Sequence, residues 1–415
     1  MSSEYLENRI YELLESHLEH RPFHLHRLAA VCTGVLLAGT TELSKVARWI
    51  RKPSQQSSRV QFLKRFLMSP YFNQAAAYHP LVSQALQGYK APTWHLIMDR
   101  TTLIPHQRDL LMVSLSFRKR AIPLGWQLLD FGCTGSAIQI ELFQRIEGLI
   151  PTKQAVVVHG DTEFGSVPLM RFIRKHPAWD FILAQTSHTY FQEPDGSWHY
   201  MGDMPVKPHQ PVYRAQVRWT KEHQYGPINL FAFYAPHQSG PTGPRYERRY
   251  CVTSLPITHT LRRLGRRRWG TEPMYRDYKS SGWHLDHSGL QDPDQTETLL
   301  VVLSINYLWA TAIGRWLCKS GLRYQVDAKK TSFQLISSRL GLAHSQTCNG
   351  APHTYSINSL SVSSFLSFFR ILLNGGEGNR LQVAGFFRAT CHLQPIIRWG
   401  DTSCSRTFLA LVRPS

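Results

Sequence analysis

The sequence predicts an α/β protein, with a mixed sheet flanked by helices, a β-rich insertion and an N-terminal all-helical region. Three observations predict this architecture. The apolar run that begins at Thr93 ends on Asp99, and the run from Gln154 ends on Asp161, as expected of strands buried on both faces. Helical spacing of apolar residues follows the second run. From about 191 to 258, aromatic and β-branched residues alternate with polar residues and prolines, which is typical of antiparallel strands.

Residues 1–88 carry helical patterning. Thr40-Thr41-Glu42 offers an N-cap and an acidic first turn to one short helix, and a polar break at 53–58 precedes a basic helix over Val60–Met68. Two short helices around a polar break resemble a helix-turn-helix, so we interpret this region as a DNA-binding domain. A plain helical bundle fits the same pattern, because no groove-reading signature accompanies it.

The elements of the core follow in a fixed order along the chain. They are the strand at 93–102, a hairpin over 109–132, a helix at 136–150, a strand at 154–161, a helix at 167–175 and a strand at 181–185. Three strands in a meander, then helix, strand, helix and strand, is the order of the ribonuclease H-like fold, whose first and fourth strands are neighbours. We therefore expect the carboxylates of Asp99 and Asp161 to lie side by side. Alternatively, Asp99 caps a turn through Thr101 and Thr102.

The formal charge is +19, from 47 basic and 28 acidic residues, which indicates a polyanionic partner such as nucleic acid. The excess is concentrated between Lys207 and Arg276, where only Glu222, Glu247 and Glu272 oppose it. Basic residues interleaved with aromatics suit a surface that holds phosphates and stacks on exposed bases. A solvated charged face is the alternative. The candidate DNA contacts are Arg214, Arg218, Arg248, Arg249, Trp198 and Trp219.

The segment after Thr260 is expected to be helical, although Gly270 and Pro273 weaken a helix interior. Its charged residues recur at intervals of four, four and three, which places them on one helix face. They are Arg268, Glu272, Arg276 and Lys279. A solvated run of ion pairs gives the same spacing.

The seven cysteines are scattered singly, which argues against a zinc site and a disulfide framework and favours a cytoplasmic protein. The apolar stretch 299–318 is interrupted by Asn306 and Arg315, so we interpret it as a buried core helix and expect no membrane partner. A further apolar helix is expected at 358–374. The predicted domains are 1–88 (helical), 89–190 (core, first part), 191–258 (basic insertion), 259–320 (core, last part) and 321–415 (C-terminal region).

Asp99, Asp161 and Glu272 are separated by 61 and then 110 residues. This order resembles the DDE transposases of bacterial insertion sequences, in particular the group with a Tyr-x2-Arg-x3-Glu-x6-Lys signature. Arg268-x3-Glu272-x6-Lys279 fits that spacing, and Gly265 stands where the family has tyrosine. The resemblance covers roughly residues 25 to 320.

The resemblance implies Mg²⁺ (Mn²⁺ can substitute) held by the three carboxylates, since two hard cations can clamp an in-line displacement at phosphorus. Asp99 would bridge both ions, with Asp161 and Glu272 completing one site each. Arg268, Lys279 and Arg276 would hold the DNA backbone. His159 and Glu163 flank Asp161 and are second choices as ligands, because neighbours in a strand point to the other face.

The implied function is a transposase that binds terminal inverted repeats, cleaves double-stranded DNA and joins the ends to a target. A homodimer on DNA and hairpinned element ends are further implications of the resemblance. Two alternatives stay open. One is a Mg²⁺-dependent nuclease of the same fold without strand transfer, and the other is an inactive DNA-binding derivative, which the Gly265 departure favours.

Overall fold

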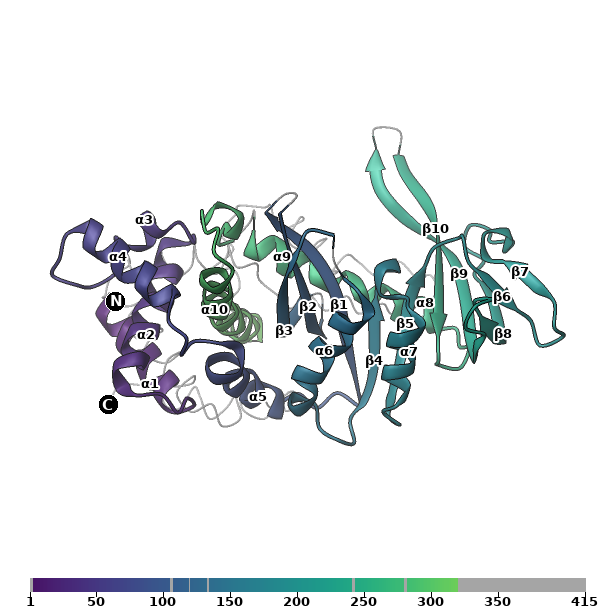
Figure 1. The fold of residues 1–415 in the computed structure, drawn as a ribbon, viewed down its shortest axis with the longest axis horizontal. Coiled ribbons are helices and arrows are strands. Elements are labelled where there is room, and N and C mark those ends of the chain that lie inside the picture. Colours follow the sequence, from purple (N-terminus) through teal and green to yellow (C-terminus); the bar gives the residue numbers. More distant parts are fainter. Residues whose placement is uncertain are drawn as a thin grey trace. The chain divides into compact units, whose positions relative to one another are not determined.

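The computed structural model describes residues 3–104, 107–118, 120–132, 134–240, 243–279 and 282–319 (Figure 1). The chain divides into two compact units. The first consists of Met1–Lys90 together with the chain from Pro273 onward, and the second of Ala91–Glu272. The first boundary lies close to the predicted one at 88. The helix expected at 358–374 and the tail after it lie outside the described residues.

The first unit is helical throughout its described part. Its helices are α1 (Ser3–Glu15), α2 (Pro22–Ala38), α3 (Leu43–Val46), α4 (Gln56–Leu67), η1 (Gln74–Tyr78), α5 (His79–Gln87), α9 (Thr271–Tyr278) from Pro273 onward, η6 (Leu285–His287) and α10 (Pro293–Lys319). Helix α2 begins with a proline in its first turn and ends where Gly39 takes a left-handed conformation, with φ 63°. Its residues 28–37 are all buried, as expected of a helix that is apolar around its whole circumference.

Helix α10 packs against α2 and α4. The side-chain amide of Asn306 donates to the backbone carbonyl of Cys32 at 3.2 Å, which satisfies part of a polar group that is fully buried. Within the described parts of the chain, Pro293–Arg315 is the one stretch long and apolar enough to cross a membrane, and 78% of its most apolar window is buried in the protein. This burial agrees with the interpretation of 299–318 as a core helix.

The second unit contains a mixed sheet of ten strands in the order β3-β2-β1-β4-β5-β10-β9-β8-β6-β7. The strands are β1 (Thr93–Ile104), β2 (Arg108–Phe117), β3 (Arg120–Asp130), β4 (Ala155–Gly160), β5 (Trp179–Gln185), β6 (Tyr190–Gln192), β7 (Trp198–Tyr200), β8 (Val212–Trp219), β9 (Tyr225–Gly240) and β10 (Gly243–Thr253). Strand β4 is parallel to both β1 and β5, and the other pairs are antiparallel. The predicted adjacency of the first and fourth strands is confirmed, with Ile97 opposite His159.

Helices cover the sheet on both faces. Helices α6 (Ser136–Ile146) and α7 (Val167–Arg174) contact β3 and β5 and lie in front of the strands in Figure 1. Helix α8 (Leu261–Gly265) and the 3-10 helix η5 (Arg266–Gly270) lie behind them. A side chain at Gly270 would place its Cβ 3.1 Å from the backbone carbonyl oxygen of Arg120 and 3.4 Å from Ile97. Glycine therefore lets η5 approach β1 and β3 closely.

The β-rich segment after 191 continues the core sheet. Strand β10 pairs with β5, so that Cys251 lies opposite Ala184, and β9, β8, β6 and β7 follow outward. Trp219 is 1% exposed within this layer. The prediction that Trp219 stacks on an unpaired base is therefore corrected: its ring belongs to the apolar core of the extension, where the alternation of a strand turns it inward.

Replacing Trp219 by alanine should lower the free energy of unfolding by about 3–5 kcal/mol, because a large buried ring leaves a cavity that its neighbours fill incompletely. The matched control is Trp198→Ala, which removes the same side chain from a half-buried position on β7. Urea titrations followed by circular dichroism measure both. Similar small losses for the two variants would contradict the placement of Trp219 in the core.

Candidate active site

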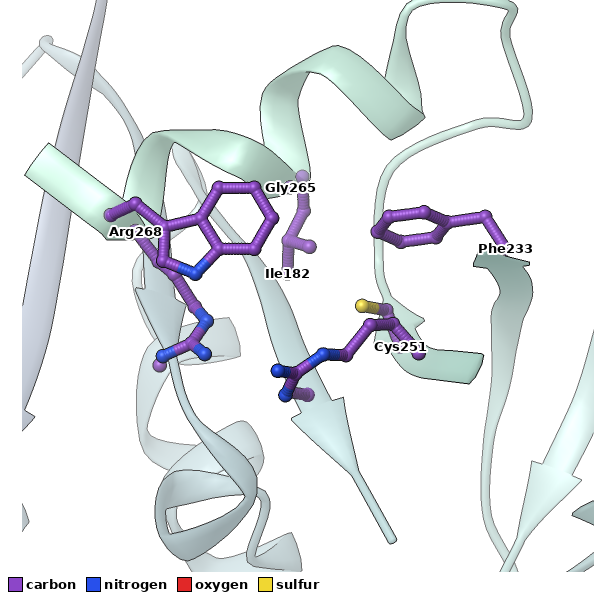
Figure 2. Close-up of a pocket in the computed structure, with 9 residues that line it drawn as sticks. Ile182, Phe233, Cys251, Gly265 and Arg268 are labelled. Atoms are coloured by element: carbon purple, nitrogen blue, oxygen red, sulfur yellow. The ribbon is translucent and has the colours of Figure 1, made fainter. Parts of the chain in front are cut away.

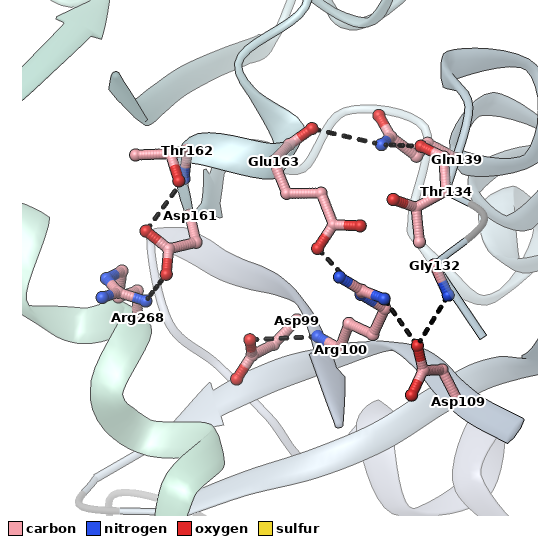
Figure 3. Close-up of polar contacts among 10 residues, drawn as sticks. All are labelled: Asp99, Arg100, Asp109, Gly132, Thr134, Gln139, Asp161, Thr162, Glu163 and Arg268. Atoms are coloured by element: carbon pink, nitrogen blue, oxygen red, sulfur yellow. Dashed lines mark hydrogen bonds and ion pairs between the residues drawn. The ribbon is translucent and has the colours of Figure 1, made fainter. Parts of the chain in front are cut away.

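Asp99 and Asp161 come together where the parallel pairing of β1 with β4 ends, directly after Met98 and Gly160 (Figure 3). Asp99 does not end its strand as the apolar run suggested, because β1 continues to Ile104 through its pairing with β2. Asp99 lies on β1, and Asp161 directly follows β4 as the N-cap of the short 3-10 helix η3 (Thr162–Phe164). Burial raises the pKa of Asp99, and the charge of Asp161 raises it further, while the Thr271 hydroxyl and the charge of Arg268 oppose the rise. The expectation that these two carboxylates are neighbours is confirmed.

Each carboxylate is oriented in the same way. The backbone N–H of Arg100 donates to Asp99 Oδ1 at 3.0 Å, and the backbone N–H of Thr162 donates to Asp161 Oδ1 at 2.8 Å. The second oxygens accept from the helical segment behind the sheet: Thr271 donates to Asp99 Oδ2 at 2.5 Å, and Arg268 Nη1 lies 3.0 Å from Asp161 Oδ2. The pair of like charges is thus held by two backbone amides, one hydroxyl and one guanidinium.

The residue that reaches Asp99 from this segment is Thr271, the neighbour of the predicted Glu272. The reason is the type of helix. In the expected α-helix, Arg268 and Glu272 would share a face, four residues apart. In the 3-10 helix η5, each residue turns by about 120°, so side chains three apart eclipse, and Thr271 falls below Arg268. The prediction of one continuous α-helical face is wrong at this point.

Glu272 is exposed in the first turn of α9 (Thr271–Tyr278). Arg276 is also exposed, one turn later on the same helix, and Lys279 directly follows its end. Both of these cations belong to the first unit. Among the described residues, no group of three or more His, Cys, Asp or Glu side chains lies close enough to hold a metal ion. Asp99 and Asp161 therefore meet without a third carboxylate.

The two second-choice ligands are engaged elsewhere. His159 is fully buried on β4, and its Nε2 lies 2.9 Å from Nδ1 of His95 on β1. Burial lowers the pKa of His95 to about 3, aided by the charge of Arg267, and lowers that of His159 well below its usual value. Both imidazoles are therefore neutral. Glu163 lies on η3 and pairs with Arg100.

Arg100 joins three segments around the carboxylate pair, a role that the sequence analysis missed (Figure 3). Its Nε donates to Glu163 at 2.9 Å, and its Nη1 donates to Asp109 on β2 at 2.5 Å. The Asp109 side chain is 1% exposed, so this carboxylate depends on its partner for its charge. Arg100 follows Asp99 in the chain and Glu163 lies two residues after Asp161, so the ion pair fixes η3 against β1. The sequence does contain a signal for this role, because Arg100 directly follows the apolar run that ends on Asp99.

A pocket lies beside Arg268, between β5, β9, β10 and the helical segment (Figure 2). Its walls combine apolar side chains with two arginines, and Gly265 lines it in place of a larger residue. The lining residues are Gly160, Ile182, Ala184, Phe233, Arg249, Cys251, Gly265, Arg268 and Trp269. A Cβ at position 265 would meet Phe231 at an ordinary 3.5 Å. The backbone therefore does not require glycine there, and the departure from tyrosine leaves the pocket open.

The four arginines proposed for phosphate contact do not form one surface. Arg248 and Arg249 are consecutive on β10 and therefore point to opposite faces of the sheet. Arg249 lines the pocket and pairs with Glu247 at 2.8 Å, whereas Arg248 donates to the Tyr234 hydroxyl at 3.1 Å.

On β8, Arg214 pairs with Glu193 at 2.9 Å, and Arg218 is exposed with no acidic partner among the described residues. On β7, the half-buried Trp198 lies 5.9 Å from the ammonium of Lys221, which is 4.1 Å from Tyr190. Trp198 stays a candidate for base stacking.

Replacing Arg100 by methionine should lower the free energy of unfolding by on the order of 3 kcal/mol, because it leaves the Asp109 carboxylate buried without its partner. Glu163→Gln removes only the ion pair between Arg100 and Glu163, which is partly exposed, and should lower the free energy of unfolding by under about 1 kcal/mol. Adding Asp109→Asn to Arg100→Met should recover much of the loss, since the buried charge is then gone. Urea denaturation of the three variants and the parent checks this order. Equal losses of unfolding free energy for Arg100→Met and Glu163→Gln would contradict the role of Arg100 as the partner of the buried Asp109.

No protein-family model matches the chain, and no curated protein matches it in sequence. Among solved structures, a piggyBac transposase in a synaptic complex with hairpin DNA aligns with 85% of this chain and 85% of its own. The aligned residues are 11% identical, and the TM-score is 0.35. We therefore infer the function from the chain's own residues.

Proposed function

We propose that this protein is a Mg²⁺-dependent DNA transposase with a ribonuclease H-like core. It binds the terminal inverted repeats of an insertion sequence, cleaves at the element ends and joins them to target DNA, as a homodimer in the bacterial cytoplasm. The observation that carries the proposal is the meeting of Asp99 and Asp161 on adjacent parallel strands beside Arg268. The Arg268-x3-Glu272-x6-Lys279 spacing and the charge of +19 support it.

The donor set fits a magnesium ion. Mg²⁺ takes hard oxygen ligands, keeps several waters and needs only one or two carboxylates besides substrate phosphates. Asp99 and Asp161 supply two carboxylates from adjacent parallel strands. Mutual repulsion of the two carboxylates favours a cation between them. When bound, the metal would activate water or a 3′-hydroxyl and stabilise the leaving oxygen.

The protein groups have distinct tasks in this proposal. Asp99 and Asp161 would hold the metal, in place of their present contacts with Thr271 and Arg268. Arg268, released from Asp161, then contacts the phosphate next to the cleaved bond, for which a guanidinium is suited by its planar pair of donors. The approach of Glu272 requires a change of helix type: with about 100° per residue in place of 120°, it turns toward the face of Arg268.

An inactive DNA-binding derivative is the second candidate, and the exposed position of Glu272 favours it. A nuclease that cleaves without joining strands is the third. Incubating the chain with candidate element ends, a target plasmid and Mg²⁺ separates all three. Joined products identify a transposase, cleavage without joining identifies a nuclease, and binding without cleavage identifies the derivative.

Asp99→Ala and Asp161→Ala should each abolish cleavage and leave specific DNA binding intact, because binding depends on cations elsewhere. Binding can even tighten, since a carboxylate repels phosphates. Glu272→Ala should also abolish cleavage if the helix changes type with DNA bound. Single-turnover cleavage and electrophoretic mobility shifts measure the two properties. Parent-like cleavage by any of these variants would remove that residue from the set of ligands.

Neutralising Arg214, Arg218, Arg248 and Arg249 together should weaken DNA affinity and flatten the slope of log K against log salt, by about 0.9 per lost phosphate contact. Arg218→Met alone should account for more of the change than Arg214→Met, because Arg214 is already paired with Glu193. Fluorescence anisotropy with a labelled duplex at several salt concentrations gives the salt slope of the parent, the fourfold variant and the two single variants. An unchanged slope in the fourfold variant would assign these arginines to the fold alone.

A further inference from the structure

Two cations lie by the aromatic pair Phe62 and Phe66 in the first unit, and a third, Arg65, directly precedes Phe66 on α4. Arg27 comes from α2, Lys52 from the loop before α4, and Arg65 from α4 itself. The guanidinium of Arg27 lies 5.8 Å from the ring centres of both Phe62 and Phe66, and the ammonium of Lys52 lies 3.7 Å from the ring centre of Phe62. We call Arg27, Lys52 and Arg65 the Phe62 cation cluster. The aromatic faces favour the cations of Arg27 and Lys52 at these positions.

The cluster has no acidic partner among the described residues. Helix α4 contains no acid at all, and the nearby Arg51 pairs with Glu4 at 3.0 Å, outside the cluster. Burial lowers the pKa of Lys52, and the charges of Arg27 and Arg65 lower it further. Burial and the charge of Arg65 do the same to Arg27. The fold therefore holds three like charges close enough to repel one another, a cost that a bound anion relieves.

The surroundings indicate which anion. The first half of α4 exposes Gln56, Ser57, Ser58 and Gln61, which are uncharged donors and acceptors of hydrogen bonds. Side chains of this kind on a helix, beside cations, are typical of a surface that contacts phosphates and base edges of duplex DNA. An anionic lipid headgroup carries the same charge and is the alternative that the experiment must exclude.

We propose that the Phe62 cation cluster binds a backbone phosphate of duplex DNA and so positions α4 against the duplex. This inference rests on the proposed function for the identity of the partner. It assigns the phosphate contact to Arg27, Lys52 and Arg65, none of which belongs to the second unit that carries Asp99 and Asp161. Binding at the cluster is therefore separable from cleavage.

The test compares two triple variants of the full chain on a 30-base-pair duplex by fluorescence anisotropy. Arg27→Met, Lys52→Met and Arg65→Met remove the cluster's charges but keep apolar stems against the rings. The control replaces Lys90, Lys153 and Lys175 by methionine, which removes the same charge from exposed positions outside the cluster. The cluster variant should lose at least about tenfold in affinity and at least about 0.9 in salt slope, and the control much less.

Folding is checked by thermal unfolding without DNA at low salt. The cluster variant should melt no lower than the parent, because the repulsion is gone. Should it fail to fold, Arg65→Gln, at an exposed position of α4, replaces it and should still reduce the salt slope.

The outcomes separate this inference from the proposed function. Equal slopes for the cluster variant and the control, with a parent that binds DNA, overturn the cluster as a phosphate site. Loss of binding to phosphatidylserine vesicles with unchanged DNA binding overturns it in favour of a membrane. A parent that binds DNA through the cluster but neither cleaves nor joins supports the cluster and refutes the transposase. A parent with no DNA affinity refutes both.

Discussion

The structure of the candidate site depends on holding two repelling carboxylates side by side, one on β1 and one directly after β4. Parallel pairing of these strands brings Asp99 and Asp161 together, and burial makes the negative charge of Asp99 harder to keep. The groups around the pair offset that cost. A backbone amide donates to one oxygen of each carboxylate, Thr271 donates to the other oxygen of Asp99, and Arg268 pairs with the other oxygen of Asp161. Behind them, Arg100 ties η3 to β1 and β2. Two adjacent carboxylates in a partly buried position lower the stability of the fold, and such pairs are typical of catalytic and metal-binding sites.

Much of this arrangement could be predicted from the sequence, because its determinants are local. Two apolar runs ending on carboxylates marked the strands, and the order of strands and helices predicted that β1 and β4 pair. The helix type at 266–270 could not be predicted in the same way. The same residues suit either helix, and the close packing of Gly270 on the carbonyl of Arg120 is a tertiary contact that spacing does not encode.

Other differences between the predictions from sequence and the structure also arise from packing between residues far apart in the chain. The alternation of β8 identified a strand but not which of its faces is covered, so Trp219 was assigned to the surface although it lies in the core. Arg100 and Glu163 are 63 residues apart in sequence, and Arg27 meets Lys52 and Phe62 from a different helix. Such contacts exist only once the fold is formed, which is why charge composition indicated a polyanionic partner without indicating the residues that would hold it.

The continuity of the sheet has a mechanical consequence. Strand pairing connects β8, through β9, β10 and β5, to β4 and β1, with register shifts in the β8–β9 and β9–β10 pairs. Backbone hydrogen bonds of this kind couple the outer strands to the core strands more directly than a linker couples an appended domain. We therefore expect a ligand that displaces β8 or β10 to change the twist of the sheet beneath Asp161 and Asp99. Displacement of the outer strands and the distance between the two carboxylates are therefore expected to change together, because one sheet carries both.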